Sequence, residues 1–153
     1  MKRRLMIASL MVLVAGAYLQ VLAKDPTKEV LGLRLGMSEK SARARLEKIA
    51  TWQKPDRKKR LEVWVLKSDP TYQYVTVKFK EKQLIFLQAV VNATAHVRYD
   101  ALGSLADAVT RSDGYTHTFE WKVKPRAHKA GYLLIARGNN SEFLTSYSIY
   151  IIP

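Results

Sequence analysis

The pattern that most constrains the fold of this chain is a strict alternation of side chains along Tyr72–Lys80. Val75, Val77 and Phe79 lie on one side of an extended segment, and the residues between them lie on the other. Such a period of two predicts a strand of an antiparallel sheet that buries one face and exposes the other. The following residues 84–91 are apolar on both sides, which predicts a central strand.

Four further segments have the composition of strands. Each is rich in β-branched and aromatic residues, and turn residues such as Ser68-Asp69-Pro70 and Gly138-Asn139-Asn140 separate them. These segments are residues 61–67, 115–124, 132–137 and 143–152. The sequence therefore predicts an antiparallel sheet of about six strands.

Two other segments have the spacing of amphipathic helices. Residues 38–50 begin with Ser38, a suitable N-cap, and place their apolar side chains on one face. Asp100 is suited to cap a second helix, whose apolar face consists of Leu102, Leu105, Ala106 and Val109. The polar residues 51–60, with Pro55 among them, predict a loop. The predicted fold class is α+β, with an antiparallel sheet packed by two helices.

The order helix–β–β–β occurs twice along the predicted elements, in residues 31–92 and 97–153. A shift of 57 residues places Trp64 on Trp121. One interpretation is two tandem αβ units, and the other is one continuous antiparallel sheet without duplication. In both interpretations the two tryptophans lie in alternating strands and are predicted to be buried.

The first 23 residues have the order of a secretory signal. Lys2, Arg3 and Arg4 form a cationic start, an apolar run follows, and Ala17 and Ala23 offer cleavage sites after small residues. Cleavage predicts an exported chain, periplasmic or secreted, whose domain is residues 24–153. If the segment is retained, residues 5–23 predict an anchor in the inner membrane, which holds the domain at the membrane surface.

The charge balance is strongly basic. The chain has 26 Lys and Arg residues against 13 Asp and Glu residues. Residues 24–153 keep 23 of these cations and all 13 acids, so the predicted exported part has a net charge of +10. Outside the cytoplasm, the expected partners are an envelope protein or an anionic envelope surface, and no nucleic acid is expected.

Residue types that carry chemistry are sparse in this chain. It has no cysteine, which excludes disulfides and thiolate metal sites. His96, His117 and His128 lack the spacing of metal ligands, and no serine lies in a nucleophile elbow. The sequence therefore predicts no enzyme, no metal site and no cofactor.

Two basic clusters are the candidate binding residues. The first cluster consists of Trp52, Lys54, Arg57, Lys58, Lys59 and Arg60. The second cluster consists of Lys122, Lys124, Arg126 and Lys129. Cations beside an aromatic side chain are typical of binding to an anionic surface. If the two units superimpose, the clusters occupy corresponding loops and form one patch; the alternative is that these charges protect sheet edges from aggregation.

The motif Leu35-Gly36-Met37-Ser38 precedes the first predicted helix, and a strand with Trp64 and the hairpin of residues 75–86 follow it. In this order, residues 31–91 resemble the SmpA/OmlA family, small lipoproteins of the outer-membrane β-barrel assembly machinery. The same half is similar to the β-lactamase-inhibitor-protein-like fold, in which such αβ units occur singly or in tandem. The resemblance implies an envelope protein that binds other proteins and has no chemistry of its own. This chain lacks the lipid-bearing cysteine of those lipoproteins.

These features together predict a non-enzymatic exported protein of the cell envelope that mediates protein–protein interaction, as an assembly factor, scaffold or inhibitor. The alternative function is binding of anionic lipid or cell-envelope polysaccharide through the basic clusters. Salt distinguishes the two functions, because binding through exposed charges falls steeply as ionic strength rises.

Overall fold

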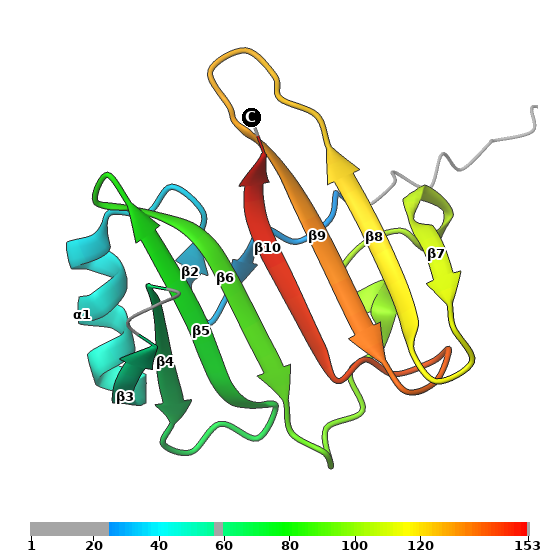
Figure 1. The fold of residues 1–153 in the computed structure, drawn as a ribbon, viewed down its shortest axis with the longest axis horizontal. Coiled ribbons are helices and arrows are strands. Elements are labelled where there is room, and N and C mark those ends of the chain that lie inside the picture. Colours follow the sequence, from blue (N-terminus) through cyan, green and yellow to red (C-terminus); the bar gives the residue numbers. More distant parts are fainter. Residues whose placement is uncertain (1–24, 57–59, 153) are drawn as a thin grey trace, which may run out of the picture.

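The computed structural model describes residues 25–56 and 60–152 of the chain. Eight strands form its main element: β3 Ala50–Asp56, β4 Leu61–Leu66, β5 Tyr72–Lys80, β6 Gln83–Val91, β7 Val109–Ser112, β8 His117–Val123, β9 Gly131–Gly138 and β10 Ser146–Ile152. They form one antiparallel sheet in the order β3-β4-β5-β6-β10-β9-β8-β7 (Figure 1). A separate hairpin consists of β1 Glu29–Val30 and β2 Leu33–Arg34.

The six strands predicted from the sequence are confirmed as β4, β5, β6, β8, β9 and β10. β5 follows its alternation in part. Val75 and Val77 are fully buried and Tyr74 and Lys78 on the other side are half-buried, but Thr76 on that other side is also buried, at 5% exposed. β6, which is apolar on both sides, pairs with β5 and β10 and lies in the middle of the sheet, as predicted.

The sheet is built from two four-stranded meanders, β3 to β6 and β7 to β10. They join where their last strands pair, with Leu87 of β6 opposite Ile149 of β10. Trp64 and Trp121 each lie in the second strand of a meander, on the same face of the sheet. Both side chains are buried, with 5% and 1% of their surface exposed, which confirms the prediction for the two tryptophans.

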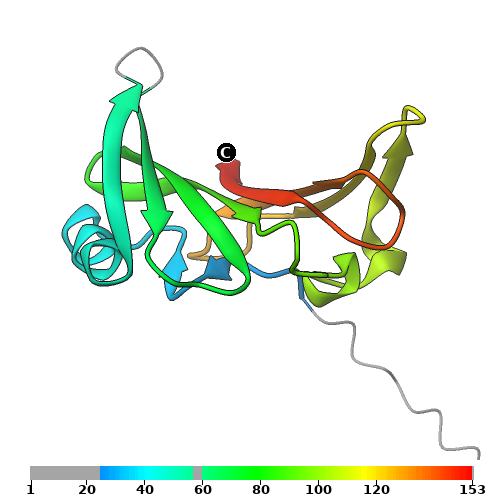
Figure 2. The ribbon, with the colours of Figure 1, turned by 90° about the horizontal axis from the view of Figure 1, so that it is seen from below.

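One face of the sheet is covered and the other is not (Figure 2). The helix α1 Glu39–Ile49, the β1–β2 hairpin and residues 92–108 lie against the covered face. The last of these segments contains two short 3-10 turns, η1 Tyr99–Ala101 and η2 Leu105–Asp107. Both edges of the sheet bend toward the uncovered side, so the uncovered face is concave.

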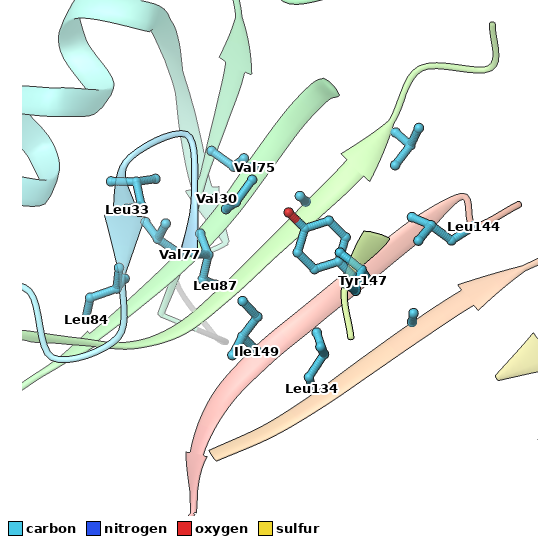
Figure 3. Close-up of a cluster of buried hydrophobic side chains, with 14 of the residues drawn as sticks. Val30, Leu33, Val75, Val77, Leu84, Leu87, Leu134, Leu144, Tyr147 and Ile149 are labelled. Carbon is cyan, nitrogen blue, oxygen red and sulfur yellow. The ribbon is translucent and has the colours of Figure 1, made fainter. Parts of the chain in front are cut away.

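The core lies between the covered face and these elements (Figure 3). Leu33 of β2 and Leu46 of α1 are fully buried together with Leu87 and Ile149 of the sheet. Tyr147 lies in the same cluster, and its hydroxyl oxygen is 3.2 Å from that of Tyr72. Burial raises the pKa of Tyr147, so this phenol stays protonated and keeps its hydrogen bond.

The first predicted helix is confirmed as α1. The Ser38 side chain accepts a hydrogen bond from the N–H of Ser41 at 3.2 Å, as expected of an N-cap. Ala42 and Leu46 form its buried face. The helix ends at Ile49 because the next residue has an extended backbone, and the chain continues directly into β3.

The second predicted helix is wrong. The turns η1 and η2 replace it, and β7 begins at Val109. The carbonyl of Ser104 accepts hydrogen bonds from the indole N–H of Trp121 at 2.7 Å and from the N–H of Asp107 at 3.2 Å, so the segment forms a 3-10 turn that is bonded to the sheet. Leu105 and Val109 are 40% and 56% exposed, so the expected apolar face is not buried.

The predicted loop over residues 51–60 is also wrong in its first half. β3 occupies Ala50–Asp56 and pairs with β4. Pro55 is tolerated there because β3 is an edge strand, where a missing N–H costs no hydrogen bond within the sheet. The register shifts between Gln53 and Asp56, around this proline.

The fold is therefore mostly β, with a single α-helix among the described residues. The prediction of an α+β fold with about six strands and two helices is wrong, and so is the helix expected at the start of the second unit. The prediction missed the short hairpin strands β1 and β2 and two strands of the eight-stranded sheet, β3 and β7, which are its two edges.

Candidate functional site

The uncovered face of the sheet carries an apolar centre between two lysines. The register places Lys78 opposite Phe86, Phe86 opposite Tyr150, Tyr150 opposite Leu133, and Leu133 opposite Lys122. These five side chains form one row across five neighbouring strands. The three apolar members are half-buried without any described element above them, because side chains opposite each other on one face shield one another.

The next row on this face is smaller and more polar. Thr76 lies opposite Gln88, Gln88 opposite Ser148, and Ser148 opposite Ile135. A third row returns to larger side chains and consists of Val65, Tyr74, Val90, Ser146 and Arg137. Thr76 and Ser148 are buried, with 5% and 7% of their surface exposed, whereas Gln88 is half-buried. A partner can therefore bury apolar surface on the neighbouring rows and form hydrogen bonds with the amide of Gln88, as protein–protein interfaces do.

The charges of the uncovered face are mostly positive. Lys78, Arg111, Lys122 and Arg137 lie on it, and Glu120 of β8 is the acid in the same rows. None of the ion pairs between described residues includes any of these five side chains. The cations are therefore available to carboxylates of a partner.

The second basic cluster lies at the end of β8 and in the loop that follows. Lys122 is on β8, and Lys124, Arg126 and Lys129 are exposed beyond it. Two backbone hydrogen bonds between Arg126 and Lys129, at 3.0 and 2.8 Å, close this loop on itself. The loop thus presents its cations to solvent.

The first basic cluster lies between β3 and β4. Trp52 and Lys54 are in β3, Arg60 is exposed just before β4, and Arg57, Lys58 and Lys59 lie outside the described residues. Four strands separate β4 from β8, so about 24 Å lie between them at about 4.8 Å per strand. The clusters follow different strands of their meanders, so the structure does not place them in corresponding loops.

Trp52 lies at a hollow of about 510 Å³ beside α1. Its side chain is 52% exposed, while Trp64 at the same hollow is buried. Arg43 of α1 pairs with Glu39 at 2.9 Å and with Glu62, and the hydrogen bond with Glu62 raises the pKa of Arg43. Of the four charged residues that line the hollow, Arg43 and Glu62 are thus paired with each other, while Glu47 and Lys67 form no ion pair among the described residues.

Sequence reasoning placed the candidate site on the cations and missed the uncovered face. The signal was present in residues 84–91 and in the last four residues of β10, 149–152. Both segments have large apolar side chains on both sides, although only one side is needed for the core. Phe86 and Tyr150 are the side chains that this second apolar side contributes.

The described residues include no group of three or more His, Cys, Asp or Glu side chains placed to hold a metal ion. Among them there is also no helix with the length and hydropathy needed to cross a membrane. The predicted signal or anchor in residues 1–23 lies outside the described residues.

Comparison of the chain with protein-family models, with curated proteins and with solved structures found no match. The resemblance to SmpA/OmlA lipoproteins in residues 31–91 therefore stays a prediction.

In the turn between β7 and β8, we expect the carboxyl of Asp113 to titrate below the ordinary aspartate value of about 3.9. Its Oδ1 accepts hydrogen bonds from the N–H of Thr116 at 2.7 Å and of Tyr115 at 3.0 Å, which lowers the pKa of Asp113. Because the folded-state pKa is lowered, the stability that this group contributes is present above the unfolded value. It is lost as the pH falls through the folded-state pKa.

An NMR titration that follows the amide signal of Thr116 through the acid range checks this expectation. The same titration on an Asp113→Ala variant is the control, because it removes the transition that Asp113 causes. A midpoint at or above the ordinary aspartate value would contradict the hydrogen-bonded turn.

Proposed function

We propose that this protein is a non-enzymatic exported protein of the cell envelope that binds an acidic face of a partner protein with the uncovered face of its sheet. The observation that carries the proposal is the row from Lys78 through Phe86, Tyr150 and Leu133 to Lys122. It combines aromatic and aliphatic side chains at the centre with cations at both ends.

The centre of this row supplies the residue types that carry binding energy in protein interfaces. Tyrosine in particular is enriched among hot-spot residues, which lie centrally and are surrounded by contacts that exclude water. Tyr150 is in this position, because it lies on β10 near the middle of the sheet with Phe86 on one side and Leu133 on the other. The concave shape of the face lets a convex partner contact all three.

The cations around the centre support an acidic partner. Lys78, Lys122, Arg111 and Arg137 outnumber Glu120 on this face, and none of them has an ion pair among the described residues. Complementary charge at the rim of an interface accelerates association and selects against positively charged partners. The resemblance in residues 31–91 implies the same class, an envelope protein that binds proteins.

A second candidate function is binding of anionic lipid or polysaccharide through the loop after β8. The loop residues Lys124, Arg126 and Lys129 are exposed, and no acidic residue lies among residues 124–130. In this case the affinity for the anionic surface rises with the number of cations in the loop and does not depend on an aromatic centre.

The test begins with capture of a partner from an envelope extract by the immobilised chain. The captured protein is then purified, and its dissociation constant for the chain is measured by calorimetry. We expect Tyr150→Ala to weaken binding about 30-fold, a loss of about 2 kcal/mol at a central hot spot. We expect the double charge reversal Lys78→Glu with Lys122→Glu to weaken binding as well. Its loss of affinity should be larger at low salt than at high salt, because salt screens the charges.

The matched control is the charge reversal Lys40→Glu with Lys48→Glu. Both lysines are exposed on α1, which lies against the opposite face, so the net charge changes equally without touching the uncovered face. Equal affinities of the two double variants would contradict the proposal. Binding to vesicles of phosphatidylglycerol and phosphatidylethanolamine that is lost on neutralising Lys124, Arg126 and Lys129 would favour the second function instead.

A further inference from the structure

The two edges of the sheet differ in how well they are protected against pairing with another strand. β3 contains Lys54 and Pro55 and has a shifted register, all of which disfavour addition of a strand. β7 contains no proline, pairs with β8 in unbroken register, and has four exposed residues. The edge formed by β7 is therefore the one that accepts a further strand more easily.

Exposed apolar side chains gather at the β7 edge. Of the four large hydrophobic residues that are most exposed in the described chain, three are there: Leu105 at 40%, Val109 at 56% and Tyr115 at 87%. Leu105 precedes β7 in η2, Val109 is in the strand, and Tyr115 is in the turn after it. The fourth, Trp52, is on the other edge strand. Such an edge is typical of a surface that another chain covers.

The backbone of β7 has free hydrogen-bonding groups in a defined pattern. Asp113 donates its N–H to the carbonyl of Thr116 at 3.3 Å, which makes these residues the closing pair of the hairpin. Hydrogen-bonded pairs alternate along an antiparallel ladder. The backbone N–H and C=O groups of Arg111 and Val109 therefore bond to β8, whereas those of Thr110 and Ser112 point away from β8, toward the outer edge. Outside the ladder with β8, neither the N–H nor the C=O of Thr110 or Ser112 has a hydrogen bond to another described residue.

A second copy of this chain fits that pattern poorly. In an antiparallel pair of two β7 strands, the outward backbone groups of Thr110 and Ser112 can all bond only if Thr110 of one copy lies opposite Ser112 of the other. This register sets the two Arg111 residues opposite each other. Residues opposite at this type of position have Cα atoms about 4.5 Å apart, and like charges there are destabilising. Thr118 separates Arg111 from Arg137 in the same row, whereas the acid Glu120 lies opposite Val109, so the positive charge of this edge lies at Arg111 and not along the whole strand.

We propose that the outer edge of β7 is a strand-addition site for an extended acidic segment of a partner protein. The segment runs antiparallel to β7, with an acidic residue opposite Arg111 and an apolar residue two positions later, opposite Val109. The site is distinct from the one in the proposed function, because it uses the backbone of an edge strand and not the centre of the uncovered face.

The test uses two capped synthetic peptides, TTETVTT and TTKTVTT, added to the isotopically labelled full-length chain. We expect the glutamate peptide to bind about fivefold more tightly than the lysine peptide, as an opposite charge facing Arg111 predicts. The largest amide shifts are expected at Thr110 and Ser112. In the Arg111→Glu variant the preference between the two peptides should reverse.

Thr110→Pro removes an outward N–H and leaves the ladder with β8 intact, because the N–H of Thr110 does not bond to β8. This variant should lose binding of the glutamate peptide, and Phe86→Ala, which tests the uncovered face, should keep it.

Equal binding of the two peptides, unchanged binding by a folded Thr110→Pro variant, or shifts centred on β3 would overturn the proposal. A dimer in analytical ultracentrifugation that dissociates in the Thr110→Pro variant would assign the edge to self-pairing and overturn it as well. If Thr110→Pro does not fold, the reversal of preference in Arg111→Glu decides the question alone.

Discussion

Replacing Trp121 by alanine is expected to lower the free energy of unfolding by about 3–5 kcal/mol, the usual cost of removing a buried tryptophan. The side chain is 1% exposed, and its ring stacks on that of Phe119 with centroids 6.2 Å apart. Its indole N–H also donates to the carbonyl of Ser104 at 2.7 Å. The substitution therefore leaves a cavity and removes one of the two hydrogen bonds that the part-buried Ser104 carbonyl accepts, the other coming from the N–H of Asp107. A loss of this size is a large part of the about 5–15 kcal/mol that stabilises a typical domain.

Urea denaturation followed by circular dichroism measures this loss. Trp121→Phe separates its two parts, because it keeps most of the apolar contact and removes the hydrogen bond, and about 1–3 kcal/mol is expected for it. Tyr115→Ala is the matched surface control, since 87% of that side chain is exposed and a change within about 0.5 kcal/mol is expected. A loss of less than about 1 kcal/mol for Trp121→Ala would contradict the core position of the ring.

How far the sequence predicts this fold depends on where each strand lies in the sheet. The six strands that it predicts each bury a row of side chains on the covered face, and burial on one side produces the period of two. β7 is exposed at all four residues, and β3 contains Pro55 and three exposed residues after its start. Because an edge strand pairs on one side only, it tolerates proline and polar residues, and the pattern that identifies a strand is weak there.

The prediction of the second helix is wrong for a different reason. Leu102, Leu105, Ala106 and Val109 have the spacing of a helical face, but of these only Leu102 is buried. The segment is held instead by a distant part of the chain, through the bond from Trp121 to Ser104 and through Gly103, where a Cβ would lie 3.1 Å from the backbone of Pro26. Local periodicity contains no information about such contacts, and tertiary structure overrides it.

The part of the candidate site that consists of residues close together in the sequence was predictable. A cluster of cations can be read directly from the sequence, and the structure places Lys122 of the second cluster on the uncovered face. Which face of the sheet is uncovered is decided by where α1 and residues 92–108 pack, and this is a non-local property. The row through Phe86 and Tyr150 also requires the pairing of β6 with β10, which are far apart in the chain.

Replacing Gly138 by alanine is expected to cost about 3 kcal/mol, at the upper end of what overpacking a folded interior costs. Gly138 is buried at the end of β9, where the chain turns toward β10. A Cβ there would lie 2.2 Å from the carbonyl oxygen of Phe143 and 2.4 Å from the hydroxyl oxygen of Tyr99. The first contact is with backbone, so a side-chain rotation cannot relieve it. Gly36→Ala is the control, because no atom lies within 4 Å of that position and its cost is limited to the positive φ of +78°, about 1–2 kcal/mol.

A double-mutant cycle with Tyr99→Phe locates the strain. The Tyr99 hydroxyl donates to the carbonyls of Asn140 at 3.1 Å and His117 at 3.3 Å, so Tyr99→Phe alone is expected to cost about 1 kcal/mol. In the Gly138→Ala background the same change removes one of the three atoms that lie within 3.0 Å of the added Cβ, the third being Leu144 Cα at 2.9 Å. The double variant should therefore lose less stability than the two single losses added together. Strict additivity, measured by urea denaturation, would mean that the added methyl group does not meet Tyr99. A cost for Gly138→Ala no greater than that for Gly36→Ala would contradict the close approach of β9 to the Phe143 backbone, and with it the packing that holds residues 139–145 against the end of the sheet.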